Sequence, residues 1–435
     1  MKGKEAHHMR RIIAEDPEWN LATVPNLADI CLKHIVSNFG EKPLLNELIQ
    51  QDRNHVLKNL PVNIPLSTTA NLITDEDYWR RCCTARWKIC DVSCYAQSWR
   101  RMFFEKNLQE CIEKFVPGTT DPKQLEDLLL LSGKFIHCLK INNLLPPIKE
   151  PQKTGDDDFS DSESETGEEV NMDHFDFTTA VPHLPNLEEL HLCYGVRDCG
   201  MNFEWDLFEF TNRDCSMLAK AVKDCKKIKL FHLHKSKVND EKARVLISHM
   251  LDHPSLTTLD LSYNKLSNSS ARALGKLLNN RSILSHLALV DNNIGPQGAA
   301  AIAHALGKNT TLKTLNLRLN RLEDEGCQSI LRVLLKNNTL EEIHLGSNNI
   351  THKSTPLLAQ VLVYNKSVKN MNLSCNKFNE EGGKTIQEGM EDNGTIVQMD
   401  MRMTDIGQEC EYSISQLLKK NREAIRRKNE RAAST

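Results

Sequence analysis

A sequence motif of the form L-x-x-L-x-L-x-x-N-x-L recurs at a fixed spacing through the second half of this 435-residue chain. Clear copies read LTTLDLSYNKL at 256–266, LSHLALVDNNI at 284–294 and LKTLNLRLNRL at 312–322. The first apolar position advances by 28 residues from copy to copy, through Ile228, Leu256, Leu284, Leu312, Leu340, Val368 and Ile396. A fixed period of this length predicts a solenoid, in which each repeat contacts its neighbours and the stack offers a long surface to binding partners.

Each copy is predicted to hold a strand followed by a helix. Alternate residues of a strand point to opposite sides, so Leu259 and Leu261 are expected inside the solenoid, as are Leu315 and Leu317. An asparagine can donate and accept hydrogen bonds at the bend after each strand. It occupies positions Asn264, Asn292, Asn320, Asn348 and Asn376. In the 284 copy a helix is expected in GPQGAAAIAHALGKN, with Pro296 in its first turn.

A βα unit of 28 residues resembles the ribonuclease-inhibitor class of leucine-rich repeat. The predicted fold class is therefore α/β, with a curved parallel sheet inside the solenoid, helices outside, and a small α-helical domain in front. An earlier copy, LEELHLCYGV at 187–196, fits this pattern with Gly195 in place of the asparagine, and a weaker candidate begins at Ile136. The solenoid is predicted to span residues 121–418.

Residues 1–120 lie outside the repeat period and are predicted to form a helical domain that covers the exposed edge of the first strand. Within it, one helix is expected over 75–115, capped at its start by Asp75 or Thr74 and ended by Pro117-Gly118. One face of this helix is expected to carry Trp79, Cys83, Trp87, Cys90 and Cys94.

Two alternative interpretations of this region stay open. A metal site at Cys82, Cys83, Cys90 and Cys94 lacks a paired C-x-x-C, and cysteine on an apolar helix face is more often buried core. Residues 60–83 faintly resemble an F-box, the helical adaptor that precedes leucine-rich repeats in some ubiquitin ligases.

Charge is unevenly distributed, although the formal net charge of −3 by itself indicates no partner. An acidic insert at about 150–176 is predicted to be disordered, because it is rich in acidic residues and poor in apolar ones. The basic tail at 419–435 is predicted to be a solvated extension of the last helix, with contact to an acidic surface such as a microtubule as the alternative.

No run of 18 apolar residues and no apolar signal core is found in the sequence, so no contact with a membrane is expected. The 14 cysteines are then interpreted as reduced intracellular thiols.

The repeat register predicts which side chains face outward from the sheet, where a protein partner would bind. They are Glu189, His191, Tyr194, His232, His234, Lys235, Asp260, Tyr263, His286, Asp291, Asn316, Arg318, Glu342, His344, Asn372, Asp400 and Arg402. Their mixed charges differ from the one-sign field of a nucleic-acid binder, so no nucleic acid is expected.

Three of these histidines, His191, His232 and His234, are expected on neighbouring strands. A metal site there lacks a carboxylate or thiolate at firm ligand spacing, so no metal and no cofactor are predicted. The sequence holds no Gly-rich phosphate loop, nucleophile elbow or H-E-x-x-H motif, so no catalytic residues are predicted and the chain is not expected to be an enzyme.

Three segments together carry a more specific resemblance: the block WRRCCTARWKICDVSCYAQSWRRMFFE, the acidic insert, and LEELHLCYGVRDCGMNFEWDLFEFTNRDC. With the repeats, they resemble the leucine-rich-repeat subunits of the nexin–dynein regulatory complex, over nearly the whole chain. The resemblance implies a non-enzymatic scaffold in the axoneme of cilia and flagella, which helps to link outer doublet microtubules and to regulate dynein-driven motility, including that of sperm. The implied partners are coiled-coil subunits, a second leucine-rich-repeat subunit, and doublet microtubules, directly or indirectly.

Two other functions remain as alternatives. A Ran-type GTPase activator uses the same repeat class, but such proteins resemble plain solenoids followed by an acidic tail. A leucine-rich-repeat adaptor of a ubiquitin ligase would have to bind the ligase's linker subunit through residues 55–115.

Overall fold

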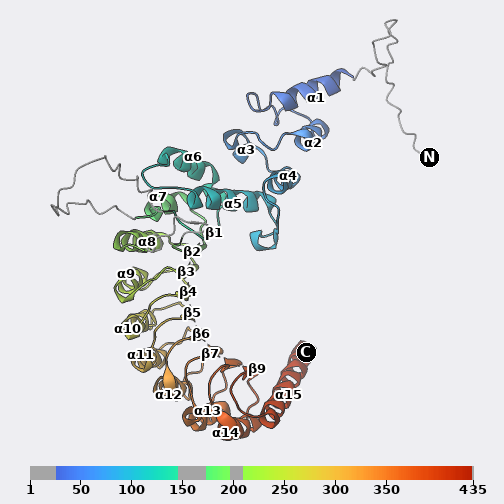
Figure 1. Cartoon of the computed structure of the whole chain (residues 1–435). Coiled ribbons are helices and arrows are strands. Elements are labelled where there is room, and N and C mark those ends of the chain that lie inside the picture. Colours follow the sequence, from blue (N-terminus) through green and yellow to red (C-terminus); the bar gives the residue numbers. More distant parts are fainter. Residues whose placement is uncertain (1–25, 146–172, 196–208, 434–435) are drawn as a thin grey trace, which may run out of the picture. The chain divides into compact units, whose positions relative to one another are not determined.

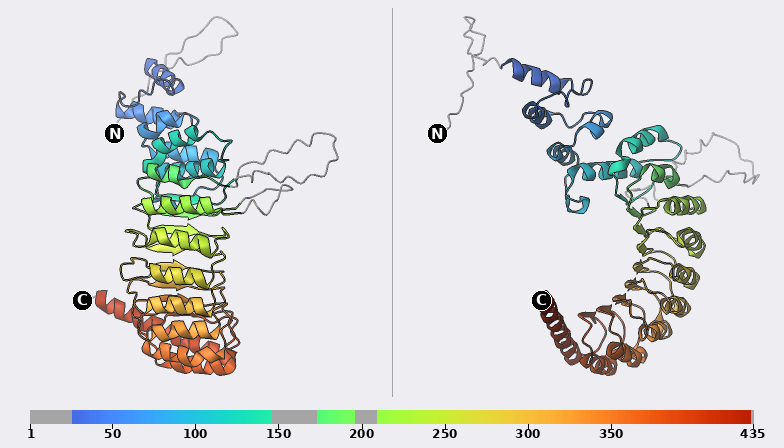
Figure 2. Two further views of the ribbon diagram at one scale, coloured as in Figure 1. Left: turned by 90° about the vertical axis from the view of Figure 1, so that its left-hand side faces the viewer. Right: turned by 180° about the vertical axis from the view of Figure 1, so that it is seen from behind.

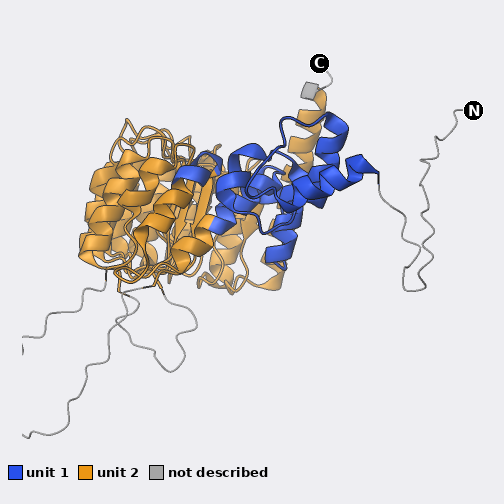
Figure 3. Cartoon of the chain, turned by 90° about the horizontal axis from the view of Figure 1, so that it is seen from above, with its two compact units in different colours: residues 1–107, 130–135 blue, residues 108–129, 136–435 orange. Residues whose placement is uncertain are grey.

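A computed structural model describes residues 26–145, 173–195 and 209–433 of the chain (Figure 1). The predicted acidic insert lies outside the described residues, apart from 173–176. The chain divides into two compact units, one of residues 1–107 and 130–135 and the other of residues 108–129 and 136–435 (Figure 3). The predicted domain boundary at residue 120 and the capping role of the first domain stay predictions.

The first unit is helical. Its helices are α1 (Leu27–Ser37), α2 (Gln50–Asn59), α3 (Leu66–Leu72), α4 (Glu76–Arg86), the larger part of α5 (Trp99–Glu113), and the short 3-10 helices η1 (Ser93–Tyr95) and η2 (Gly133–Phe135). Trp79 is fully buried, with its ring centroid 5.1 Å from that of Phe103 and 5.0 Å from that of Phe104. Its indole Nε1 donates a hydrogen bond to the carbonyl oxygen of Ile73 at 3.0 Å. This aromatic cluster forms the core of the unit, with its one polar group satisfied.

The single helix predicted over 75–115 is wrong, because the segment forms α4 and α5 with an irregular connection between them. The expected cap is present, since Asp75 accepts a hydrogen bond from the Tyr78 amide at 2.7 Å. The Asp91 carboxylate accepts a bond from the Ser93 amide at 2.9 Å, a local bond that competes with the helical pattern. Ala96 and Gln97 then take positive φ values of 53° and 61°, which reverses the chain. Cys94 is exposed in this connection and not on a buried helix face.

The second unit contains a parallel sheet of nine strands within the described residues, in the order of the sequence. The strands are β1 (Cys138–Ile141), β2 (Glu189–Leu192), β3 (Leu230–Leu233), β4 (Thr258–Asp260), β5 (His286–Ala288), β6 (Thr314–Asn316), β7 (Glu342–His344), β8 (Asn370–Asn372) and β9 (Gln398–Asp400). All seven copies of the clear repeat supply a strand, and so do the earlier copy at 187 and the weak candidate at Ile136. The predicted leucine-rich-repeat fold is confirmed, with nine strands.

Helices connect the strands and lie along the outer side of this unit, one above the next (Figure 2). The connecting helices are α7 (Phe177–Ala180), η3 (Val181–His183), α8 (Asn212–Asp224), α9 (Asp240–Met250), α10 (Asn268–Leu277), α11 (Pro296–Leu306), α12 (Glu323–Leu334), η6 (His352–Ser354), α13 (Thr355–Tyr364) and α14 (Asn379–Glu391). Two more helices flank the sheet in the sequence: α6 (Pro122–Ser132), whose last three residues belong to the first unit, precedes β1, and α15 (Gln408–Ala433) follows β9. Leu259, Leu261, Leu315 and Leu317 are fully buried between sheet and helices, as predicted. Among the described residues, no helix combines the length and the apolar composition that crossing a bilayer requires.

The repeated asparagines make the hydrogen bonds that the sequence predicts. Asn320 donates from Nδ2 to the carbonyl oxygens of Leu289, Leu317 and Arg318 at 2.8–3.1 Å, and its Oδ1 accepts from the Ile294 amide at 3.1 Å. One side chain thus joins two repeats and satisfies backbone groups at the bend that no strand can pair. A second buried set has the same role after the helices and consists of Asn309, Asn337, Asn365 and Asn393.

Candidate functional site on the strand face

The strand register lines up the outward-facing side chains in rows that cross the sheet. We call this surface the strand face. Its central row runs Lys140, His191, His232, Asp260, Ala288, Asn316, His344, Asn372 and Asp400. The row before it runs Cys138, Glu189, Leu230, Thr258, His286, Thr314, Glu342, Asn370 and Gln398. The register therefore gathers ten of the predicted site residues into two adjacent rows.

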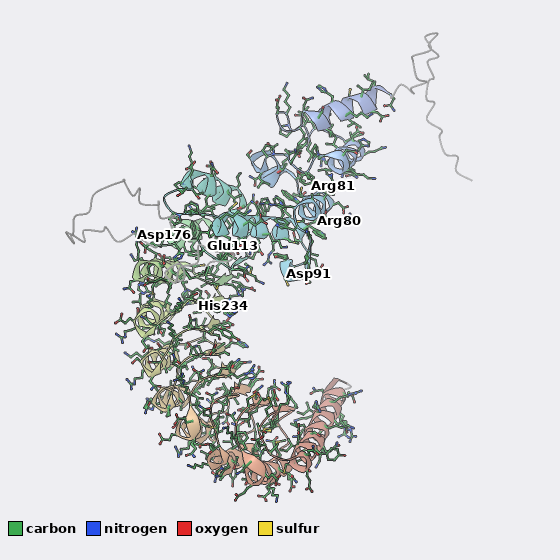
Figure 4. The ribbon with its side chains drawn as sticks, in the orientation of Figure 1. Arg80, Arg81, Asp91, Glu113, Asp176 and His234 are labelled. Atoms are coloured by element: carbon green, nitrogen blue, oxygen red, sulfur yellow. The ribbon has the colours of Figure 1, made fainter. Side chains whose placement is uncertain are left out.

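The other predicted site residues lie within three residues after the strands end. His234 follows β3 and lies on the side of the sheet away from the helices (Figure 4). Arg318 follows β6 and Arg402 follows β9 in the same way along the chain. Lys235, Tyr263 and Asp291 come one residue later in their repeats and have positive φ values of 50°, 59° and 51°. This left-handed position turns their side chains into solvent, and all three are exposed.

The prediction that Tyr194 faces a partner is wrong, because its side chain is only 1% exposed. It occupies the same repeat position as Lys235 and Tyr263, but it is not among the residues with positive φ. Its ring packs on Phe210 with centroids 4.5 Å apart and on His174 with centroids 5.3 Å apart. The repeat pattern fails here because Phe210 and His174, which do not belong to the repeated motif, pack on the Tyr194 ring.

A connected group of side chains lies at the β2–β4 end of the face. The Nδ1 atoms of His191 and His232 are 3.0 Å apart, and His232 Nε2 pairs with the carboxylate of Asp260. His191 Nε2 lies 3.5 Å from Glu189 Oε2. The ring centroids of His232 and His234 are 5.0 Å apart, and the buried Nδ1 of His234 has no hydrogen-bond partner among the described residues.

Burial controls the protonation of this group. Burial, and then the neighbouring His232, lower the pKa of His191 to about 4, and the same two causes lower the pKa of His234. Burial alone would raise the pKa of Asp260, but hydrogen bonds from His232 and Ser262 outweigh it and lower that pKa. His191 and His234 are therefore neutral near pH 7, and Asp260 is ionised.

Ion pairs and hydrogen bonds also join neighbouring groups at the other end of the face. Arg402 holds Asp400 through contacts of 2.9 and 2.7 Å, and Asn372 donates to the same carboxylate at 2.9 Å. The hydrogen bond from Arg402 is the main cause that lowers the pKa of Asp400. His344 Nε2 is 3.0 Å from Glu342 Oε1. These groups pair with one another within the face, so their side chains are held in defined positions.

Two features of this face were not predicted from the sequence. Cys138 is buried on β1, and its sulfur belongs to a set of ligand atoms with Glu189 and His191 that lie within 4.8 Å of one another. A thiol and a carboxylate, which the sequence did not place beside the histidines, thus lie close to His191. The second feature is a set of exposed apolar side chains at the left-handed position, Leu319 at 41% and Met403 at 79%, which resemble Tyr263 at 44%. The one-per-repeat spacing of this position is visible in the sequence.

A separate cavity of about 860 Å³ lies in the second unit, lined largely by apolar residues of α6, α7 and α8 and of the segments beside them. Leu125, Phe175 and Leu218 are among its lining residues. His174 also lines it, with Nδ1 2.8 Å from the buried Asp214 carboxylate and Nε2 without a partner among the described residues. None of the predicted site residues lines this cavity.

Comparisons with known proteins agree with the repeat architecture. A family model described as Leucine Rich repeat matches residues 252–275, 282–303, 308–331 and 336–353. A solved internalin (inlF) from Listeria monocytogenes is 16% identical to this chain, and the match covers 68% of this chain and 75% of the internalin with a TM-score of 0.36.

Two relatives give more specific information. The chain is 50% identical over 263 residues to dynein regulatory complex subunit 5 of Mus musculus. That match covers 60% of this chain and 53% of the mouse protein. It is 32% identical over 220 residues to the protein of the same name from Chlamydomonas reinhardtii. That match covers 50% of this chain and 50% of the algal protein. The chain therefore spans about half the length of the relatives it matches. Over that shared length, the chain is similar to dynein regulatory complex subunit 5 from both organisms.

Proposed function

We propose that the chain is a non-enzymatic subunit of the dynein regulatory complex in the axoneme of cilia and flagella. The observation that carries the proposal is the identity of 50% over 263 residues with the mouse subunit, supported by 32% with the algal one. Proteins as distant as these two share a name that places them in this complex. A stack of repeats joined by buried asparagine bonds is suited to a component that must hold its shape while it is docked.

Within that complex, the proposed role of the chain is that of a scaffold. It helps to link outer doublet microtubules and to regulate dynein-driven motility, including sperm motility. Its partners in this role are the coiled-coil subunits, a second leucine-rich-repeat subunit, and the doublet microtubules, directly or indirectly. The strand face supports such a role, because its polar groups already pair with one another and need little reorganisation on binding.

The contact surface in this proposal is the strand face together with the exposed side chains at the left-handed position. Tyr263, Leu319 and Met403 supply apolar area beside the charged rows, and aromatic and methionine side chains are enriched at the centres of protein interfaces. Lys235 Nζ lies 5.6 Å from the centre of the Tyr263 ring, which helps to hold that ring in place.

The test is retention in the axoneme. The tagged chain is expressed in a motile ciliated cell that lacks its own copy, the membrane and soluble matrix are removed with detergent, and the chain is measured along the axoneme. We expect retention, and we expect it to fall when other subunits of the complex are absent. Complete release into the soluble fraction would overturn the proposal and favour the GTPase-activator or ligase-adaptor functions.

A pair of variants separates the contact surface from the function. Tyr263→Ala with Met403→Ala removes apolar area from the strand face, and we expect at least a threefold loss of retained protein. Tyr364→Ala with Tyr412→Ala is the matched control, since both tyrosines are exposed on helices at 69% and 67%. Equal retention of the two variants would show that the partner binds elsewhere, while the assignment to the axoneme would stand.

A further inference from the structure

Three neighbouring strands bring four ligand-type side chains together at the first end of the sheet. The register places Cys138 of β1 beside Glu189 of β2, and His191 of β2 beside His232 of β3. Glu189 and His191 are two residues apart on one strand, so both point to the strand face. One ligand atom from each of Cys138, Glu189 and His191 lies within 4.8 Å of the other two.

The hydrogen bonds around His191 leave its Nε2, without a proton, facing the carboxylate of Glu189, which can only accept. The carboxylate of Asp260 can only accept, so His232 Nε2 must carry the proton that it shares with Asp260. A neutral His232 then has a bare Nδ1, which must accept from the Nδ1 of His191 at 3.0 Å. The remaining nitrogen, His191 Nε2, is in turn bare, yet it lies 3.5 Å from the Glu189 carboxylate. Two lone-pair atoms at this distance repel one another unless a proton, a water molecule or a cation lies between them.

We propose that Cys138, Glu189 and His191 bind one divalent transition-metal ion of the zinc class, while His232 and Asp260 hold the ring of His191 in the tautomer that ligates. Thiolate, imidazole and carboxylate are the three ligand types that zinc accepts, and three protein ligands leave a fourth position for water or for a group of a partner. The chain of contacts from His191 through His232 to Asp260 is the kind that fixes ligand orientation at zinc sites.

Distances and charges are consistent with this site. Zinc bonds of about 2.0–2.3 Å require tetrahedral ligand atoms roughly 3.5 Å apart, so the side chains must close by about 1 Å on binding. One thiolate and one carboxylate balance the charge of the ion. The positive charge of Lys140 disfavours binding of the ion, because Lys140 is the strand neighbour of His191. The same charge contributes to the lowered pKa of His191. The ion would tie β1 to β2 and so stabilise the first end of the sheet.

The rival arrangement contains no metal. A doubly protonated His232 donates to both Asp260 and His191, and His191 then donates from Nε2 to Glu189. This network satisfies the same four groups with one extra proton, and it predicts no specific metal binding.

The test uses the full chain, freed of metal with a chelator under reducing conditions and titrated with Co²⁺. We expect one Co²⁺ per chain with a thiolate-to-cobalt charge-transfer band, displaced by one equivalent of Zn²⁺. Cys138→Ser and His191→Gln are each expected to weaken Co²⁺ binding at least 30-fold, and Asp260→Asn about 10-fold with the band retained. Lys140→Met is expected to bind Co²⁺ more tightly than the parent.

Matched controls are Cys375→Ser and His286→Gln, which change an exposed cysteine and an exposed strand-face histidine in other repeats. Both should bind Co²⁺ as the parent does. A Co²⁺ spectrum that survives Cys138→Ser, or no binding at one equivalent, would overturn the proposal and favour the proton network. If the variants fail to fold, X-ray absorption of the zinc-loaded parent decides: one sulfur among the zinc ligands is expected, and a shell without sulfur contradicts the site.

Discussion

Buried asparagines are the residues on which the bends of the solenoid depend. Asn320 is 5% exposed and makes four hydrogen bonds to backbone groups of two repeats. An aspartate has no N–H to donate, and a leucine makes no hydrogen bond, so neither can replace it. This explains why the sequence keeps a polar residue inside an otherwise apolar pattern.

Replacing Asn320 with alanine should therefore destabilise the protein strongly. Each buried backbone group left without a partner costs about 1–3 kcal/mol, so we expect Asn320→Ala to lower the free energy of unfolding by roughly 3 kcal/mol. Urea unfolding followed by circular dichroism measures it. The control is Asn293→Ala, an exposed asparagine next to the repeated position, which should change stability by less than about 0.5 kcal/mol. Similar losses for both variants would contradict the role of the buried bonds.

His191 should give the metal-free protein a pH dependence of stability. Its pKa falls from 6.5 to about 4 on folding, because burial and the neighbouring His232 disfavour its charged form. Between these values the unfolded chain binds more protons than the folded one, so stability declines as the pH falls from 6.5 towards 4. Glu189 opposes this shift and Lys140 adds to it.

An NMR titration of the histidine ring protons checks this expectation. The His191 signal should begin to shift only well below pH 6, and His191→Gln should reduce the loss of stability in this range. His286→Gln serves as the control, since His286 is exposed on the same face. A His191 signal with its midpoint near 6.5 would contradict the burial argument.

At the scale of elements, the helices of neighbouring repeats approach closely at a glycine. A Cβ at Gly326 of α12 would lie 2.9 Å from the Cβ of Ala299 and 3.1 Å from the Cα of Pro296, both on α11. The same repeat position is glycine at Gly298 and Gly382, where an added Cβ would also be crowded. Glycine is thus required here by the space between helices and not by backbone conformation.

Gly326→Ala should separate α11 from α12 in spite of the better helix propensity of alanine. Alanine gains about 1 kcal/mol over glycine in a helix, whereas overpacking costs about 1–3 kcal/mol. We expect a net loss of roughly 1 kcal/mol and a lower Tm in a thermal melt. Gly394→Ala is the control, because nothing lies within 4 Å of its added Cβ. A Gly326→Ala variant as stable as the parent would show that the helices can move apart freely.

At the scale of the whole solenoid, each strand pairs only with its neighbours in the sequence. Stability should then be a sum of repeat and neighbour terms, and damage should stay local. Leu315 is fully buried in β6, and its replacement by alanine costs about 2–5 kcal/mol through the lost contacts and the cavity left behind.

Hydrogen exchange of Leu315→Ala measures how far that damage spreads. We expect the amides of β5, β6 and β7 to lose most of their protection, while those of β2 and β3 keep theirs. The apolar residue Ile283 is 41% exposed, so Ile283→Ala is a control that should leave the pattern unchanged. An even loss of protection from β2 to β9 would instead mean that the solenoid unfolds as one cooperative unit.

Sequence alone determined the repeating part of this protein. The period of 28 residues predicted each strand from β3 to β9, the buried leucines and the asparagine bonds, because these depend on spacing along the chain. The weak copy at Ile136 also proved to be a strand, β1. Each of these features repeats a local pattern, so a single copy is enough to interpret all the others.

Only the tertiary structure decided the features at which the repetition stops. The break between α4 and α5 depends on local bonds and positive φ values that helical periodicity does not reveal. Tyr194 is buried because Phe210 and His174 pack on it from beyond the repeat pattern. Cys138, Glu189 and His191 meet because parallel strands in register bring residues about 50 positions apart to one point, with Cys138 opposite Glu189. Spacing along the chain predicts what repeats, whereas contacts between distant segments arise only when the strands pair.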